Sequence, residues 1–362
     1  MPPVLKAVVY LDQFAISNIF KLRNGTLSPT SNSYDFWSHL GPVLSRAYLR
    51  QQVAFPSSPI HFKETNVSAT PAEMRAAHAM LSGEVSFRRL EEIELGQLIP
   101  FARAFHQGQA APSLDLQVRD ILVGDPDRWL PRYHIGMTTD YSAFAPGQRK
   151  SRDAAASELA ALTRRWAVEK PSFEAVFTRE LEAFGSAKLE ALSQTLQRAA
   201  RAQEVHDLLE LFEATHTPDY VQFLQLAGFF ESLGVPADEG WDTVVRFWSW
   251  SGMADLPFHR LGAALFASLA RKFTAGQKKA PSPGMLSDFE AISLFGPYVD
   301  AMLLDRECSN FVRELRPDPA HLLRAKVFSL ADGDEFIDYL NILAEGAPED
   351  VRQQADALYR PA

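Results

Sequence analysis

Short apolar runs near both ends of the chain predict the strands of an α/β fold. Residues 5–12 and 299–304 have the length and apolar character of buried strands, and shorter runs of this kind cover residues 52–55 and 325–329. The segments between them repeat apolar residues every three or four positions, which is the spacing of one helix face. Strand and helix patterns therefore alternate in these two parts of the chain.

The middle of the chain has a different pattern and is predicted to be predominantly helical. From Ser172 to about Ala214 the apolar spacing indicates one long amphipathic helix. Residues 110–152 are rich in Pro, Gly and Asp, so a loop is expected there. The predicted parts are a discontinuous α/β domain over residues 1–70 and 256–346, a helical insertion over residues 71–255 and a C-terminal tail over residues 347–362.

Composition and charge narrow the class of protein. The chain has 362 residues and a net charge of −9, which is not the charge of a protein that coats nucleic acid. A nucleic-acid enzyme remains compatible, because only the surface at its cleft must be basic. Cys308 is the only cysteine, which excludes a disulfide framework and a Cys-based zinc site and favours the cytoplasm. We expect no membrane span, because no run of about 18 apolar residues occurs.

Four carboxylates lie where the predicted strands end or the helices begin. Asp12 and Asp305 directly follow apolar runs, and Glu64 and Asp288 lie near helix starts. Carboxylates after buried strands face the crevice where open α/β sheets bind ligands. Two such charges 4 Å apart repel each other by roughly 4 kcal/mol at an effective dielectric constant of about 20. A bound divalent cation would remove this repulsion, so the four acids point to metal-dependent phosphodiester chemistry.

Each acid also has an ordinary structural interpretation. Asp12 is a suitable helix N-cap, and Glu64 has the character of a surface acid. Ser287 is expected to cap the helix that Asp288 begins. Asp300 begins the strand that ends before Asp305, so we expect it at the opposite edge of the sheet and not as a ligand.

Polar residues beside the acids are candidates for substrate binding. A histidine shares a helix face with Glu64, and a serine lies about one turn beyond Asp12. Three basic residues lie beside Asp288 and Asp305. The alternatives are a structural histidine, an exposed serine and an ordinary charged surface. These candidates are His61, Ser17, Lys278, Lys279 and Arg306.

In their order and context, these motifs resemble the PIN-like nuclease domains. The resemblance is carried by Tyr10-Leu11-Asp12-Gln13, by Pro56-Ser57 with His61-Phe62-Lys63-Glu64-Thr65, and by Ser287-Asp288 with the segment from Gly296 to Asp305. It implies a parallel sheet flanked by helices, with Asp12, Glu64, Asp288 and Asp305 as catalytic ligands of Mg²⁺ or Mn²⁺. The implied activity is hydrolysis of RNA, or less often DNA, by a metal-activated water.

The insertion is the main departure from compact PIN-like domains, because more than two hundred residues separate Glu64 from Asp288. A second interpretation is therefore a non-catalytic PIN-like scaffold or interaction protein that acts through the insertion. The long helices and the aromatic residues from Trp241 to Trp250 also offer an interface for a homodimer. Convergence of the four carboxylates on one point is expected only for the nuclease.

Overall fold

The structure, a computed structural model, describes residues 5–130 and 141–359. A four-stranded sheet lies at its centre in the order β2-β1-β5-β6, and every neighbouring pair in it is parallel. The strands are β1 (Ala7–Leu11), β2 (Val53–Ala54), β5 (Ala301–Leu303) and β6 (Lys326–Phe328). The predicted α/β fold is confirmed to this extent, and β1 and β5 join the two ends of the chain.

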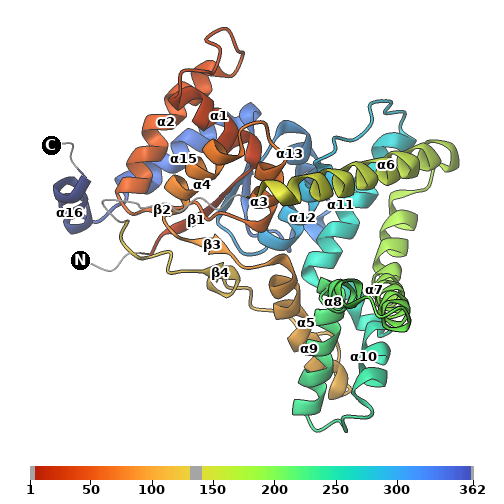
Figure 1. The fold of residues 1–362 in the computed structure, drawn as a ribbon. Helices are drawn as coiled ribbons and strands as arrows, with labels where there is room; N and C mark the ends of the chain where they lie inside the picture. Colours follow the sequence, from red (N-terminus) through yellow and green to blue (C-terminus); the bar gives the residue numbers. More distant parts are fainter. Residues whose placement is uncertain (1–4, 131–140, 360–362) are drawn as a thin grey trace.

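Helices cover both faces of the sheet, because alternate strand residues point to opposite faces. Val9 and Leu303 face one layer and pack in a core with Trp37 and Phe336. This layer contains α1 (Gln13–Arg23), α2 (Tyr34–Leu49), α4 (Pro71–Ser82) and α15 (Gly333–Glu345). Figure 1 shows α1, α2 and α15 on one side of the strands and α11 and α12 on the other.

The opposite face of the sheet belongs to a larger core that continues into the middle of the chain. Tyr10 and Met302 share this core with Phe101, Trp166 and Phe247. Helices that contribute buried residues to this core include α3 (Pro59–Asn66), α5 (Leu90–His106), α11 (Pro257–Thr274), α12 (Met285–Phe295) and α13 (Arg306–Arg313). Sheet and insertion are thus buried against each other.

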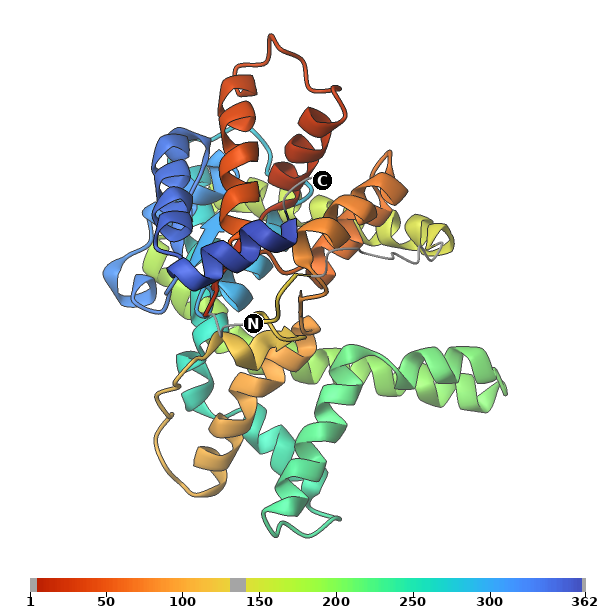
Figure 2. The same cartoon turned by 90° about the vertical axis from the view of Figure 1, so that its left-hand side faces the viewer.

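Residues 71–255 are mostly helical, as expected, with a short two-stranded antiparallel ribbon of β3 (Ser86–Phe87) and β4 (Leu122–Val123). The further helices are α6 (Ala145–Glu169), α7 (Phe173–Glu204), α8 (Leu208–Thr215), α9 (Pro218–Ser232) and α10 (Gly240–Trp248). Figure 2 shows the hairpin of α7 and α8 extending away from the sheet. None of the helices in the described ranges combines the length and apolar character needed to cross a bilayer.

Two predicted elements differ from the structure. The single helix from Ser172 to Ala214 is wrong: α7 ends at Glu204, His206 adopts a positive φ of 58°, and Asp207 caps α8 by accepting a hydrogen bond from the Glu210 backbone N–H. The loop expected over residues 110–152 is interrupted by β4 and ends early, because α6 begins at Ala145; residues 131–140 of this segment lie outside the described residues. The spacing of apolar residues does not reveal a single residue with a left-handed backbone conformation. It therefore predicts one continuous helix where the chain turns.

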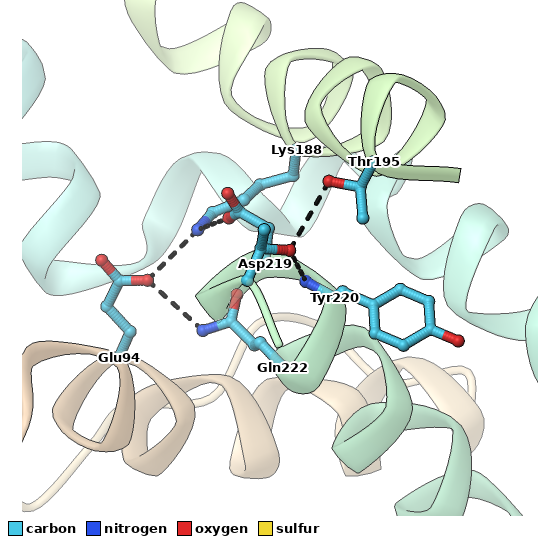
Figure 3. A network of polar contacts seen from close by, with 7 residues as sticks. Glu94, Lys188, Thr195, Asp219, Tyr220 and Gln222 are labelled. Atoms are coloured by element: carbon cyan, nitrogen blue, oxygen red, sulfur yellow. Dashed lines mark hydrogen bonds and ion pairs between the residues drawn. The ribbon is translucent and has the colours of Figure 1, made fainter. Parts of the chain in front are cut away.

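The C-terminal segment and the insertion are both tied to the rest of the fold. Residues 347–359 include α16 (Glu349–Tyr359), and the Tyr359 hydroxyl donates to the Leu130 carbonyl at 2.7 Å. In Figure 3, Lys188 of α7 lies 3.3 Å from Glu94 of α5 and 2.9 Å from Asp219 of α9. This network joins three helices of the insertion. A short helix, α14 (Pro317–Ala320), precedes β6.

Candidate metal centre

The four predicted acids come from four separate elements and line one pocket of about 510 Å³. Asp12 directly follows β1, and Asp305 lies two residues after β5. Because these strands are parallel neighbours, both residues lie at the carboxyl edge of the sheet. Glu64 belongs to α3 and Asp288 to the first turn of α12.

Backbone hydrogen bonds hold the two strand-end aspartates in place. The Asp12 backbone N–H donates to the Leu303 carbonyl at 3.0 Å, which links the end of β1 to β5. Asp12 Oδ1 accepts from the Gln13 N–H at 2.6 Å, and Asp305 Oδ1 accepts from the Cys308 N–H at 2.7 Å. Both aspartates therefore cap helices and line the pocket, so the two interpretations of these residues are compatible.

The start of α12 brings Asp288 and Glu64 together. The helix begins at Met285, so the expectation that Ser287 caps it is wrong; Gly284 occupies the N-cap position. A Cβ on Gly284 would lie 3.7 Å from Glu64 Oε1 and 3.9 Å from Asp288 Oδ2, so this N-cap position lies beside both pocket acids. A carboxylate in the first turn also benefits from the positive end of the helix dipole.

The only cysteine of the chain is buried beside two of the pocket acids. Ligand atoms of Asp288, Asp305 and Cys308 all lie within 4.8 Å of one another. Burial, followed by the nearby carboxylates, raises the pKa of the Cys308 thiol, so the sulfur stays protonated. It donates to Asp288 Oδ2 at 3.5 Å and orients this carboxyl group.

The pocket acids carry more negative charge than their surroundings compensate. Burial raises the pKa of Asp12 well above its usual value, and Asp288 and Asp305 raise it further. Burial and Asp12 raise the pKa of Glu64 to about 8, although Arg152 opposes this shift. Burial, Glu64 and Asp305 raise the pKa of Asp288 to about 7. A divalent cation would relieve this repulsion, and carboxylate oxygens are the donors that Mg²⁺ and Mn²⁺ prefer.

Of the five residues predicted to bind substrate, the structure brings Ser17 to the pocket wall. His61 is only 2 % exposed, its Nε2 lies 2.7 Å from the Leu11 carbonyl oxygen, and its ring stacks on Tyr10. Its predicted contact with substrate is therefore wrong; it supports the chain just before Asp12. The other three residues are exposed but are not among the residues described as lining the pocket: Lys278, Lys279 and Arg306.

Two basic residues that the sequence analysis missed also line the pocket, Lys21 and Arg152. Lys21 had a usable signal, because Gln13, Ser17 and Lys21 are spaced four residues apart on α1 and share one helix face. Arg152 had none, because α6 comes from the insertion and reaches the pocket only through the tertiary fold.

Asp300 has the structural role that its position suggested. Its Oδ2 accepts from the Val8 backbone N–H at 2.8 Å, and its Oδ1 lies 3.0 Å from Arg324. It directly precedes β5, whereas Asp305 follows this strand. Asp300 is thus paired and separate from the pocket acids.

Comparisons with known proteins do not identify a family for this chain. No family model, no curated protein and no solved structure matches the chain. The function is therefore inferred from the residues of the pocket.

Proposed function

We propose that the protein is a Mg²⁺- or Mn²⁺-dependent nuclease with a discontinuous PIN-like catalytic domain, and that RNA is its substrate. The observation that carries the proposal is the set of four acids that line one pocket at the carboxyl edge of a parallel sheet. Their order along the chain also matches the PIN-like resemblance. Open α/β sheets bind ligands at this edge.

We assign different roles to the four pocket acids. Asp12, Glu64 and Asp288 are assigned to hold the cation directly, and Asp305 to hold it through water or to bind a second ion. A bound cation supplies charge neutralisation for the phosphodiester and lowers the pKa of the attacking water. The helix-cap bonds of Asp12 and Asp305 and the Cys308 thiol keep three carboxyl groups oriented without substrate.

Cleavage of a labelled single-stranded RNA in Mn²⁺ tests the proposal. We expect wild-type cleavage that EDTA abolishes, and a loss of about 100-fold or more in Asp288→Asn, because one ligand charge is removed. Asp300→Asn is the matched control and should still cut, since this aspartate is bound to Val8 and Arg324. Parallel assays on DNA identify the preferred nucleic acid.

The opposite result would favour the second interpretation. If the purified chain cuts neither RNA nor DNA in Mn²⁺ or Mg²⁺, or if Asp288→Asn cuts as fast as wild type, the catalytic assignment fails. A scaffold that acts through the insertion would then be the better account.

A further inference from the structure

An exposed aromatic cluster lies at the junction of α3, which carries the pocket residue Glu64, and the start of α6, which carries the pocket residue Arg152. Phe62 and Tyr141 meet edge to face with ring centroids 4.7 Å apart, and Phe144 lies 6.5 Å from Tyr141. Phe144 is 63 % exposed and Phe62 is 37 % exposed. Figure 1 shows the beginning of α6 beside α3. Large apolar side chains grouped at the surface commonly mark an interaction site.

Positive charge accompanies these rings. The Arg75 guanidinium lies 5.9 Å from the centre of the Tyr141 ring, and Arg152 lies further along α6 in the pocket wall. Arg152 lies seven residues after Ala145, a span of roughly 10 Å at the helical rise of about 1.5 Å per residue. Roughly three stacked nucleotides cover that distance, at about 3.4 Å each.

Three unpaired polar groups come from the end of α3, from the residues after it and from α4. Asn66 Nδ2, the Ser68 hydroxyl and Arg75 Nε are buried and have no hydrogen-bond partner among the described residues. Asn66 is only 4 % exposed, and Ser68 lines the pocket. Buried polar atoms without partners are uncommon, and they concentrate where a bound group or water is missing.

We propose that this surface, formed by Phe62, Tyr141, Phe144, Arg75 and Arg152, binds a single-stranded nucleic acid and leads it into the pocket. The bases stack on the exposed rings, and Arg152 together with Lys21 contacts a phosphate. Both interactions suit a single strand, because unpaired bases offer their faces to aromatic side chains. The insertion therefore supplies part of the substrate site. The direction of the strand toward the acids rests on the proposed nuclease function, whereas binding to the rings does not.

Binding without cleavage tests this surface. Fluorescence anisotropy of a labelled 12-nucleotide RNA is measured in Mn²⁺ with Asp12→Asn protein, which leaves the RNA intact. Adding Phe144→Ala should raise Kd about 5- to 50-fold, because base stacking is lost. Phe212→Ala is the matched control, since Phe212 on α8 is 58 % exposed and remote from the pocket lining. It should change Kd by less than about twofold.

The salt dependence separates the phosphate contact from the stacking contact. Arg152→Ala should reduce the slope of log Kd against log salt concentration by about 0.7, the value for one phosphate of a single strand. Phe144→Ala should leave the slope unchanged. Arg165→Ala on the same helix is the control, because Arg165 and Arg152 each form an ion pair of 4.0 Å with an acidic side chain of α6, and Arg165 is not among the residues that line the pocket. A duplex of the same sequence should bind equally well with or without Phe144→Ala.

Several results would overturn the proposal. The first is a change in Kd below twofold in both Phe144→Ala and Arg152→Ala, and the second is an equal loss of RNA affinity in the two control variants. The others are an equal loss of duplex affinity in Phe144→Ala and no binding of the RNA at all. Hydrolysis of bis(p-nitrophenyl) phosphate in Mn²⁺ by otherwise wild-type protein distinguishes the two hypotheses. Hydrolysis with no effect of Phe144→Ala on RNA binding rejects only the surface. Phe144-dependent binding without hydrolysis rejects only the nuclease.

Discussion

At the scale of single residues, the pocket concentrates negative charge that the fold does not neutralise. Asp300 offers a comparison, because it directly precedes β5 at the other end of the strand and has an arginine and a backbone N–H as partners. Asp12 instead faces Asp288 and Asp305 in a buried setting, and both raise its pKa after burial itself. Substituting each of these two aspartates therefore allows the repulsion at Asp12 to be measured as a change in the free energy of unfolding.

Asp12→Asn should stabilise the metal-free protein by about 1–3 kcal/mol at pH 8, because it removes one of the repelling charges. The amide oxygen can still accept the Gln13 N–H, so the helix cap is retained. Asp300→Asn should instead lower the free energy of unfolding by about 1 kcal/mol or more, since it breaks the pair with Arg324. Chemical denaturation in EDTA measures both. Destabilisation by Asp12→Asn would contradict a repulsive pocket.

The effect of Mn²⁺ on stability should depend on pH. The pKa values of Asp288, about 7, and Glu64, about 8, lie above those of unfolded chains, so the metal-free folded state holds protons that the unfolded state releases. Its stability is therefore lost as pH rises from about 4 to about 8, by about 2–4 kcal/mol in total. A cation requires the deprotonated ligands and opposes this loss.

The measurement is the difference between the Tm values in Mn²⁺ and in EDTA at pH 5, 6, 7 and 8. This difference cancels groups outside the pocket and should grow with pH. At a Mn²⁺ concentration of 100 times Kd the stabilisation is about 2.7 kcal/mol. In Asp288→Asn it should nearly vanish. A difference that is independent of pH would show that these carboxyl groups do not bind the ion.

Three of the acids could be predicted from the local sequence pattern, because Asp12 and Asp305 follow strands and Asp288 lies in the first turn of a helix. Glu64 lies in the last turn of α3, so its prediction depended most on the PIN-like resemblance. Asp12 and Asp305 needed only the apolar runs before them. Arg152 could not be found, because α6 belongs to the insertion and reaches the pocket only through the tertiary fold. His61 was misplaced, because i and i+3 spacing gives a shared helix face but not which face is buried.

At the scale of elements, close helix crossings decide how the insertion packs. Gly185 of α7 is in contact with the end of α10: a Cβ at this position would lie 1.7 Å from the Trp248 carbonyl oxygen. No side chain fits there without a shift of the backbone. The same strand and helix elements were predictable from periodicity, but the break at His206 and this crossing were not, because both depend on backbone geometry.

Gly185→Ala should therefore lower the free energy of unfolding by about 2–4 kcal/mol, as expected when a packed site is overfilled. Gly228 of α9 is the matched control, because it is also helical and nothing lies within 4 Å of a Cβ there. Gly228→Ala should stabilise the protein by up to about 1 kcal/mol through helix propensity. Thermal unfolding of both variants measures the difference. Equal effects of the two substitutions would mean that α7 and α10 are not packed this closely.

At the scale of the whole molecule, the insertion and the sheet share one core. Tyr10 of β1 belongs to the same buried cluster as Trp166 and Phe247 of the insertion. An insertion joined only by linkers would open independently, whereas a shared core couples the two parts. The boundaries drawn from sequence at residues 70 and 256 mark where the pattern changes, but the sequence pattern does not reveal which helices are buried against the sheet.

The two parts should consequently unfold in a single transition. In Trp37→Phe protein, tryptophan fluorescence reports mainly on the insertion, where Trp166 and Trp248 are buried. The Cys308 thiol, 1 % exposed beside the pocket, reports on the sheet through its reaction with a thiol reagent. Their midpoints in guanidinium chloride should coincide, because one cooperative core opens at once. A thiol that becomes reactive well before or after the fluorescence change would show two independent units, and the insertion could then move relative to the pocket that Arg152 lines.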